Sequence, residues 1–113
     1  MLSQLALQAA LDFRRMREWE QFHTPQNLAI AIAVEAGELL EQFQWLLPSD
    51  AAVPSTRRSA IEAEIADVAI LLSYLANDLN INIDKAVERK LAANAERYPI
   101  EKARGSAKKH NEL

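Results

Sequence analysis

Residues 28–41 read LAIAIAVEAGELLE and place three glutamates directly after an apolar run. In a helix, the run from Leu28 to Val34 is apolar on every face, which is typical of a helix that is buried on all sides. Glu35 and Glu38 stand three residues apart, so their carboxylates would lie next to each other on that helix. This stretch therefore predicts a buried helix that carries adjacent acidic side chains.

A second acidic pair has the same spacing. Glu64 and Asp67 are three residues apart, and the apolar run VAILL follows them at residues 68–72. If the two helices pack antiparallel, the two pairs can face each other, and buried like charges need something that neutralises them. Carboxylate oxygens without histidine or thiolate partners are ligands for hard cations. The four acids therefore predict a site for Mg²⁺, or for Mn²⁺ in its place.

Two alternatives compete with this metal site. Acids three apart are common on solvated helix faces, so the four acids could instead form a polar seam in a non-catalytic helical interaction module. A di-iron bundle requires Glu-x-x-His on two helices. Glu20 and His23 give that spacing once, at the expected end of a helix, so the di-iron alternative fails.

The composition favours one all-α domain. The chain has 113 residues, of which 50% are hydrophobic, with two glycines and four prolines. A formal charge of −3 disfavours nucleic-acid binding. The absence of cysteine and the presence of two histidines exclude disulfides, thiolate sites and a multi-histidine zinc centre. No apolar run approaches the roughly 18 residues of a membrane span, and the first residues do not resemble a signal peptide, so a cytoplasmic location is expected.

Apolar positions recur at helical spacing and predict a four-helix bundle-like domain. The predicted helices cover about residues 3–20, 25 to 45 or 46, 55 or 59 to 79, and 82–99. Thr24 before Pro25 and Asn82 before Asp84 are typical of helix starts, whereas Pro48 is expected to end the second helix. Residues 1–99 are predicted to be the helical domain that carries the acidic pairs, and residues 100–113 a basic, mobile tail.

Several motifs together resemble the MazG-like all-α nucleoside triphosphate pyrophosphohydrolases, and among them the dCTP pyrophosphatase branch. The matching stretches are WEQFH at 19–23, EAGELLE at 35–41, FQW at 43–45, EIAD at 64–67, RYP at 97–99 and RGSA at 104–107. The resemblance implies Mg²⁺-dependent hydrolysis of a nucleoside triphosphate, such as dCTP or a modified pyrimidine triphosphate, to the monophosphate and pyrophosphate. It also implies a homodimer or homotetramer with sites near the subunit interfaces.

The resemblance assigns roles to individual residues. It implies metal ligation by Glu35, Glu38, Glu64 and Asp67, base binding by Trp19, His23 and Trp45, and phosphate or metal contact by Lys90 and Asn94. Either Glu35 or Glu38 is expected to activate the attacking water, and Glu41 is a weaker candidate for the same role.

Two positions depart from the dCTP pyrophosphatase pattern. Ala10 and Leu71 stand where a histidine and a tyrosine are expected, with Tyr74 nearly one turn after Leu71. The base and sugar preference therefore stays open, and a dUTP-selective relative is an alternative.

Overall fold

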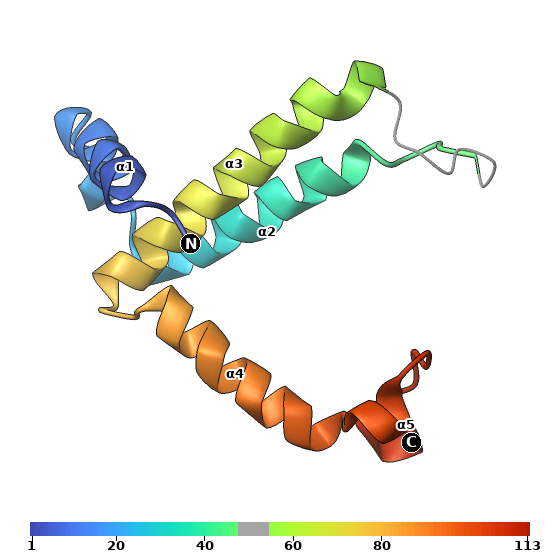
Figure 1. Ribbon diagram of the computed structural model, residues 1–113. Helices are drawn as coiled ribbons and strands as arrows, with labels where there is room; N and C mark the ends of the chain where they lie inside the picture. The colour runs from blue at the N-terminus through green and yellow to red at the C-terminus, as the bar shows by residue number, and fades with distance from the viewer. Residues whose placement is uncertain (48–54) are drawn as a thin grey trace. The chain divides into compact units, whose positions relative to one another are not determined.

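The computed structural model describes residues 1–47 and 55–113 and consists of helices joined by short turns (Figure 1). The elements are α1 (Gln4–Met16), the 3₁₀ turn η1 (Trp19–Gln21), α2 (Pro25–Glu41), α3 (Ser55–Asp78), α4 (Ile83–Arg97), α5 (Ile100–Ala103) and the 3₁₀ turn η2 (His110–Glu112). No strand occurs among the described residues, which confirms the predicted all-α class. Met1–Asn80 and Ile81–Leu113 form two compact units. The predicted boundary at residue 99 and the mobility of the tail stay predictions.

Side chains cap the starts of three helices. Ser3 Oγ accepts a hydrogen bond from the backbone N–H of Ala6 at 3.1 Å, and Thr24 Oγ1 accepts one from Asn27 at 3.2 Å. Asn82 Oδ1 accepts from the N–H of Lys85 at 3.0 Å. Each cap satisfies a backbone donor that the first turn of a helix leaves free. The predicted starts at Thr24-Pro25 and Asn82 are thereby confirmed.

The ends of the first two helices were predicted too far along the chain. The first helix ends at Met16 rather than near Glu20, because Glu18 takes a left-handed conformation with φ of 56° and the chain continues in the turn η1. The second ends at Glu41, and Trp45 is left-handed with φ of 67°. A left-handed residue cannot continue a right-handed helix. The predicted stop at Pro48 lies outside the described residues.

The third and fourth helices follow their predictions more closely. The third begins at Ser55, the earlier of the two predicted starts, so Ser59 lies inside the helix and does not cap it. The fourth ends at Arg97, and Pro99 precedes the short helix α5, which was not predicted. Tyr98 contacts His110 edge to face in this C-terminal unit, with ring centroids 5.9 Å apart.

In the N-terminal unit α2 and α3 lie side by side, and α1 lies against the C-terminal part of α3 (Figure 1). Leu28, Tyr74 and Ala76 are its buried core side chains, joined by the buried Ser73 and Arg14. Ser73 Oγ donates to the carbonyl of Ala69 at 2.7 Å, so this buried hydroxyl is satisfied within its own helix. The N-terminal unit therefore buries little apolar surface by itself.

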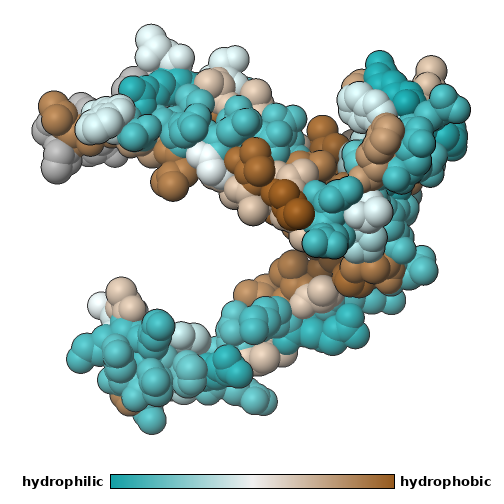
Figure 2. All heavy atoms as spheres, turned by 180° about the vertical axis from the view of Figure 1, so that it is seen from behind, coloured by the Kyte–Doolittle hydropathy of each residue, from teal (hydrophilic) through white to brown (hydrophobic). Residues whose placement is uncertain are grey.

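Many large apolar side chains are exposed instead, and apolar patches appear on both units in Figure 2. On α2 these include Ile30 and Val34, which are four residues apart and share a face. On α3 they include Ile65 and Leu72, seven residues apart. Among the described residues, no helix combines the length and apolar character that crossing a membrane requires.

Candidate functional site

Three carboxylates meet where α2 packs against α3. Glu35 of α2 and Glu64 and Asp67 of α3 each place one oxygen atom within 4.8 Å of the other two. Glu64 and Asp67 share a face because three residues separate them on one helix. The packing of α2 on α3 brings Glu35 to that face, as the two acidic pairs predicted. We call these three residues the acidic cluster.

The acidic cluster has the properties of a site for a hard divalent cation. Glu35 Oε2 and Glu64 Oε2 are buried, and neither has a hydrogen-bond partner among the described residues. Buried carboxylate oxygens without partners are costly, and a cation removes that cost by direct coordination. Because every donor is a carboxylate oxygen, the set suits Mg²⁺ or Mn²⁺ better than a softer metal.

Burial and neighbouring carboxyls raise the pKa values of Glu35 and Glu64. The neighbouring Glu38 carboxyl, burial and Glu64 raise the pKa of Glu35 from 4.5 to about 7. Burial is the largest cause that raises the pKa of Glu64, and Glu38 and Asp67 contribute in the same direction. Glu38 therefore interacts with the cluster electrostatically, although it is not one of the three residues whose oxygens converge. A bound cation would favour the ionised form of each carboxyl.

A cavity of about 560 Å³ lies beside the acidic cluster in the N-terminal unit. Its lining residues come from the chain start and α1 (Leu2, Ala6, Ala9, Ala10 and Phe13), from the η1 region (Trp19 and His23), from α2 (Glu35) and from α3 (Asp67, Ile70, Leu71 and Tyr74). Most of the wall is apolar or aromatic, and the charged part consists of two carboxylates of the acidic cluster. Such a wall suits a ligand that has a flat, weakly polar part and a negatively charged part. The negatively charged part would lie next to a cation held by the acidic cluster.

A row of rings follows the cavity wall. Phe13 meets Trp19 edge to face with centroids 5.7 Å apart, His23 lies 6.4 Å from Trp19, and Tyr74 lies 5.3 Å from His23. Burial and the nearby Arg14 lower the pKa of His23, which favours the neutral imidazole at neutral pH. Its Nδ1 is buried and has no hydrogen-bond partner among the described residues.

The remaining predicted site residues lie outside this cavity wall. Trp45 follows α2 with its side chain 86% exposed and is not a lining residue. Glu41 is exposed at the end of α2 and is not part of the acidic cluster. Lys90 and Asn94 lie four residues apart on α4, in the C-terminal unit.

The sequence model of the MazG-like family matches residues 30–113, which include the whole acidic cluster. The chain belongs to the MazG-like family. The fold also matches a solved structure: the crystal structure of a pyrophosphatase from Archaeoglobus fulgidus superposes on this chain with a TM-score of 0.80 and 43% sequence identity, and the match covers 85% of this chain and 91% of that one.

Curated relatives of this MazG-like protein include dCTP pyrophosphatase 1 of Mus musculus and of Homo sapiens, which are 42% and 40% identical to it over 105 residues. Each of these matches covers 90% of this chain and 62% of the relative. The chain thus spans less than two thirds of the length of the curated relatives that it matches.

Sequence reasoning missed the polar contacts that hold α1 of this MazG-like protein to α3. Arg14 is buried and paired with Asp78, and the Tyr74 hydroxyl donates to the carbonyl of Ala10 at 2.6 Å. One feature of the sequence indicates that Arg14 is buried and paired. Arg14 falls seven residues after Leu7, on the apolar face of the first helix, where a charged side chain needs a partner.

Proposed function

We propose that this MazG-like protein hydrolyses a nucleoside triphosphate, dCTP or a modified pyrimidine triphosphate, to the monophosphate and pyrophosphate. One observation carries the proposal: Glu35 and Asp67 line the same cavity as Trp19 and His23. A nucleotide whose base lies against the rings can place its phosphates toward the carboxylates and their cation. The names of the relatives, dCTP pyrophosphatase 1 and a pyrophosphatase, support the same reaction.

The acidic cluster, with Glu38 beside it, would hold Mg²⁺, and Mn²⁺ could replace it. When bound, such an ion neutralises charge on the triphosphate oxygens and lowers the pKa of water. The two buried oxygens of Glu35 and Glu64 that have no partner among the described residues support this assignment.

Glu35 and Glu38 are the two proposed proton acceptors. Glu35 belongs to the acidic cluster and Glu38 adjoins it, so either carboxylate is a candidate to accept a proton from water at the proposed cation. In the proposed reaction, a carboxylate oxygen of Glu35 or Glu38 takes a proton from water as that water attacks the α-phosphorus. The bond from the α-phosphorus to the bridging oxygen breaks, and pyrophosphate leaves.

The base would be held by stacking and by hydrogen bonds. Stacking on an aromatic ring such as Trp19 contributes about 1–3 kcal/mol and discriminates little between bases. The neutral imidazole of His23 has one donor and one acceptor nitrogen, so it can distinguish bases by their polar edges. Ala10 and Leu71 both line the cavity, so the two departures from the dCTP pyrophosphatase pattern fall where they can alter this selection.

Three assignments extend beyond the cavity of one N-terminal unit. Lys90 and Asn94 are proposed to contact phosphate or metal, because a cation and an amide one turn apart on α4 can serve the same anion. Trp45 is proposed to contact the base in the site of a second copy, since its exposed ring does not line the cavity of its own chain.

We further propose that the chain assembles as a homodimer or homotetramer. Ile30 and Val34 present an exposed apolar stripe on α2, and Ile65 and Leu72 present another on α3. Monomeric proteins rarely expose extended apolar patches, and subunit contact is the usual way to bury them. The small core of the N-terminal unit supports the same proposal.

The test is a substrate panel with product identification. Purified protein is incubated with Mg²⁺ and dCTP, dUTP or modified pyrimidine triphosphates, and the products are separated. The proposal expects a nucleoside monophosphate and pyrophosphate in equal amounts. Orthophosphate as the product, or no turnover of any triphosphate, would refute it, whereas a preference for dUTP would correct the proposed base.

A pair of variants separates an enzyme from an interaction module. Glu38→Gln is expected to abolish turnover and to weaken the stabilisation that Mg²⁺ gives against thermal unfolding. Glu41→Gln is the matched control, because Glu41 is an exposed acid on the same helix outside the acidic cluster. Equal Mg²⁺ stabilisation in the wild type and Glu38→Gln, with intact assembly, would instead favour the non-catalytic module.

A further inference from the structure

A partly buried ion pair joins α1 to α3. Arg14 Nη1 donates to Asp78 Oδ2 at 2.9 Å and Arg14 Nη2 to Asp78 Oδ1 at 2.5 Å, a two-pronged contact between residues 64 positions apart. The Arg14 side chain is 5% exposed and that of Asp78 25%. Burying two charges costs much of what their attraction returns, so a pair of this kind is weak evidence of stabilisation. Its bidentate geometry, in contrast, fixes the distance and orientation of the Arg14 side chain relative to Asp78.

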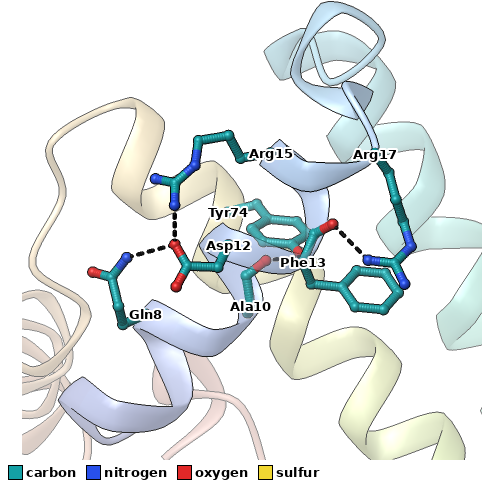
Figure 3. A network of polar contacts seen from close by, with 7 residues as sticks. All are labelled: Gln8, Ala10, Asp12, Phe13, Arg15, Arg17 and Tyr74. Carbon is teal, nitrogen blue, oxygen red and sulfur yellow. Dashed lines mark hydrogen bonds and ion pairs between the residues drawn. The ribbon is translucent and has the colours of Figure 1, made fainter.

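A second contact lies one helical turn away. The Tyr74 hydroxyl donates to the backbone carbonyl of Ala10 at 2.6 Å, as Figure 3 shows, and the guanidinium of Arg14 lies 4.5 Å from the centre of the Tyr74 ring. Ala10 and Arg14 are four residues apart on α1, and Tyr74 and Asp78 are four residues apart on α3. We call this two-point attachment the clasp.

The clasp lies in the wall of the cavity. Ala10 and Tyr74, which form its hydrogen bond, are both lining residues, and Ala9 and Phe13 of α1 line the cavity beside them. Among the apolar residues of α1, Leu7 and Leu11 are partly buried, whereas Leu5 is 84% exposed. The clasp therefore supplies polar contacts between α1 and α3 at the cavity wall.

Building on the proposed function, we propose that the Arg14–Asp78 pair is a positioning device, which holds α1 at the distance from α3 that nucleotide binding requires. Arg14 and Asp78 belong neither to the acidic cluster nor to the lining of the cavity, so the pair governs how well the base is held and leaves the chemical step alone. The pair remains ionised near neutral pH, because the hydrogen bond from Arg14 lowers the pKa of Asp78 and the hydrogen bond to Asp78 raises that of Arg14.

The test compares Arg14→Lys with Arg15→Gln. Lysine keeps the charge but replaces the planar guanidinium with a single flexible ammonium group. We therefore expect α1 to stay folded but to be held less firmly against α3. Arg15 is the matched control, because its ion pair with Asp12 is equally short at 2.5 Å but lies exposed within α1 (Figure 3). Asp78→Asn is the stronger variant, and Arg14→Lys keeps the test valid if that variant does not fold.

Two readouts are measured on the full chain with Mg²⁺. With dCTP as substrate, Arg14→Lys should raise KM about tenfold and change kcat less than about twofold, while Arg15→Gln should change neither. Hydrogen exchange of the α1 amides should be faster in Arg14→Lys, with unchanged exchange in α2 and α3.

The outcomes separate this proposal from the proposed function. If Arg14→Lys folds and keeps the wild-type KM and the wild-type exchange of α1, the clasp does not position the helix and the proposal is wrong. A lower kcat at unchanged KM also overturns it, because the pair would then act on the chemical step. If the wild type turns over no triphosphate, the proposed function fails, and the exchange of α1 alone decides whether the clasp holds the helix.

Discussion

Lowering the pH from 8 to 6 should weaken the binding of a divalent cation to the acidic cluster. The pKa of Glu35 is raised to about 7, mainly by the Glu38 carboxyl and by burial. Metal ligation requires the ionised carboxylate, so protons compete with the cation for this side chain. From that pKa, about one tenth of Glu35 is ionised at pH 6 and about nine tenths at pH 8. The apparent affinity for Mn²⁺ should therefore fall about tenfold between pH 8 and pH 6.

Titration calorimetry of the metal-free protein with Mn²⁺ at several pH values measures this change. Glu35→Gln should bind Mn²⁺ weakly at every pH and lose most of the pH dependence, since glutamine does not titrate. Glu41→Gln should retain both the affinity and the pH dependence of the wild type. Equal Mn²⁺ affinity at pH 6 and pH 8 in the wild type would refute the argument that clustered carboxyls shift the titration of Glu35.

The same shift affects the stability of the metal-free protein, and its sign can be worked out. The raised pKa means that the folded state keeps a proton on Glu35 between about pH 4.5 and 7, where the unfolded state has already released it. The free energy of unfolding should therefore fall as the pH rises through this window. Added Mn²⁺ should oppose that loss above pH 7, because it binds the ionised form in the folded state. A metal-free stability that rises across this window would contradict the shift.

Substitutions at three further positions test the packing of the N-terminal unit by chemical denaturation at fixed protein concentration. Leu28→Ala should lower the free energy of unfolding by about 2–5 kcal/mol, because Leu28 is 1% exposed and truncating its side chain leaves a cavity. A loss below about 1 kcal/mol would show that the surrounding side chains close this cavity. Tyr74→Phe should cost about 1 kcal/mol, since it removes the hydrogen bond to Ala10, and no loss would mean that this bond has no net value. Thr24→Ala should cost about 1 kcal/mol by removing the cap on the N–H of Asn27, whereas Thr24→Ser, which keeps the hydroxyl, should cost less.

Local sequence signals were sufficient where the chemistry is local. The caps at Thr24 and Asn82 depend on a side chain and a backbone N–H three residues later, so the sequence alone shows both partners. The meeting of Glu35 with Glu64 and Asp67 was also predictable, because acids beside apolar runs on successive helices require a shared neutralising partner.

Other features depend on contacts that no local pattern shows. The first helix contains helix-forming residues beyond Met16, yet it ends there because Glu18 adopts a left-handed conformation. The partner of Arg14 stands 64 residues away, and nothing near Asp78 distinguishes it from an ordinary acid at a helix end. Long-range pairing of this kind becomes visible only after α1 and α3 are placed against each other.

The small core and the proposed assembly suggest how stability and activity are linked in this protein. Leu28, Tyr74 and Ala76 are the buried apolar side chains of the described residues, whereas Ile30 and Val34 face outward from the helix that carries Glu35. Subunit contact on that face would bury apolar surface and hold α2 in place, so the acidic cluster would gain rigidity from assembly. Ile30→Glu should then dissociate the assembly and weaken Mn²⁺ binding together, although residue 30 is not a ligand. Calorimetry alongside analytical ultracentrifugation measures both effects, and a dissociated Ile30→Glu protein with wild-type Mn²⁺ affinity would show that the metal centre is complete within one chain.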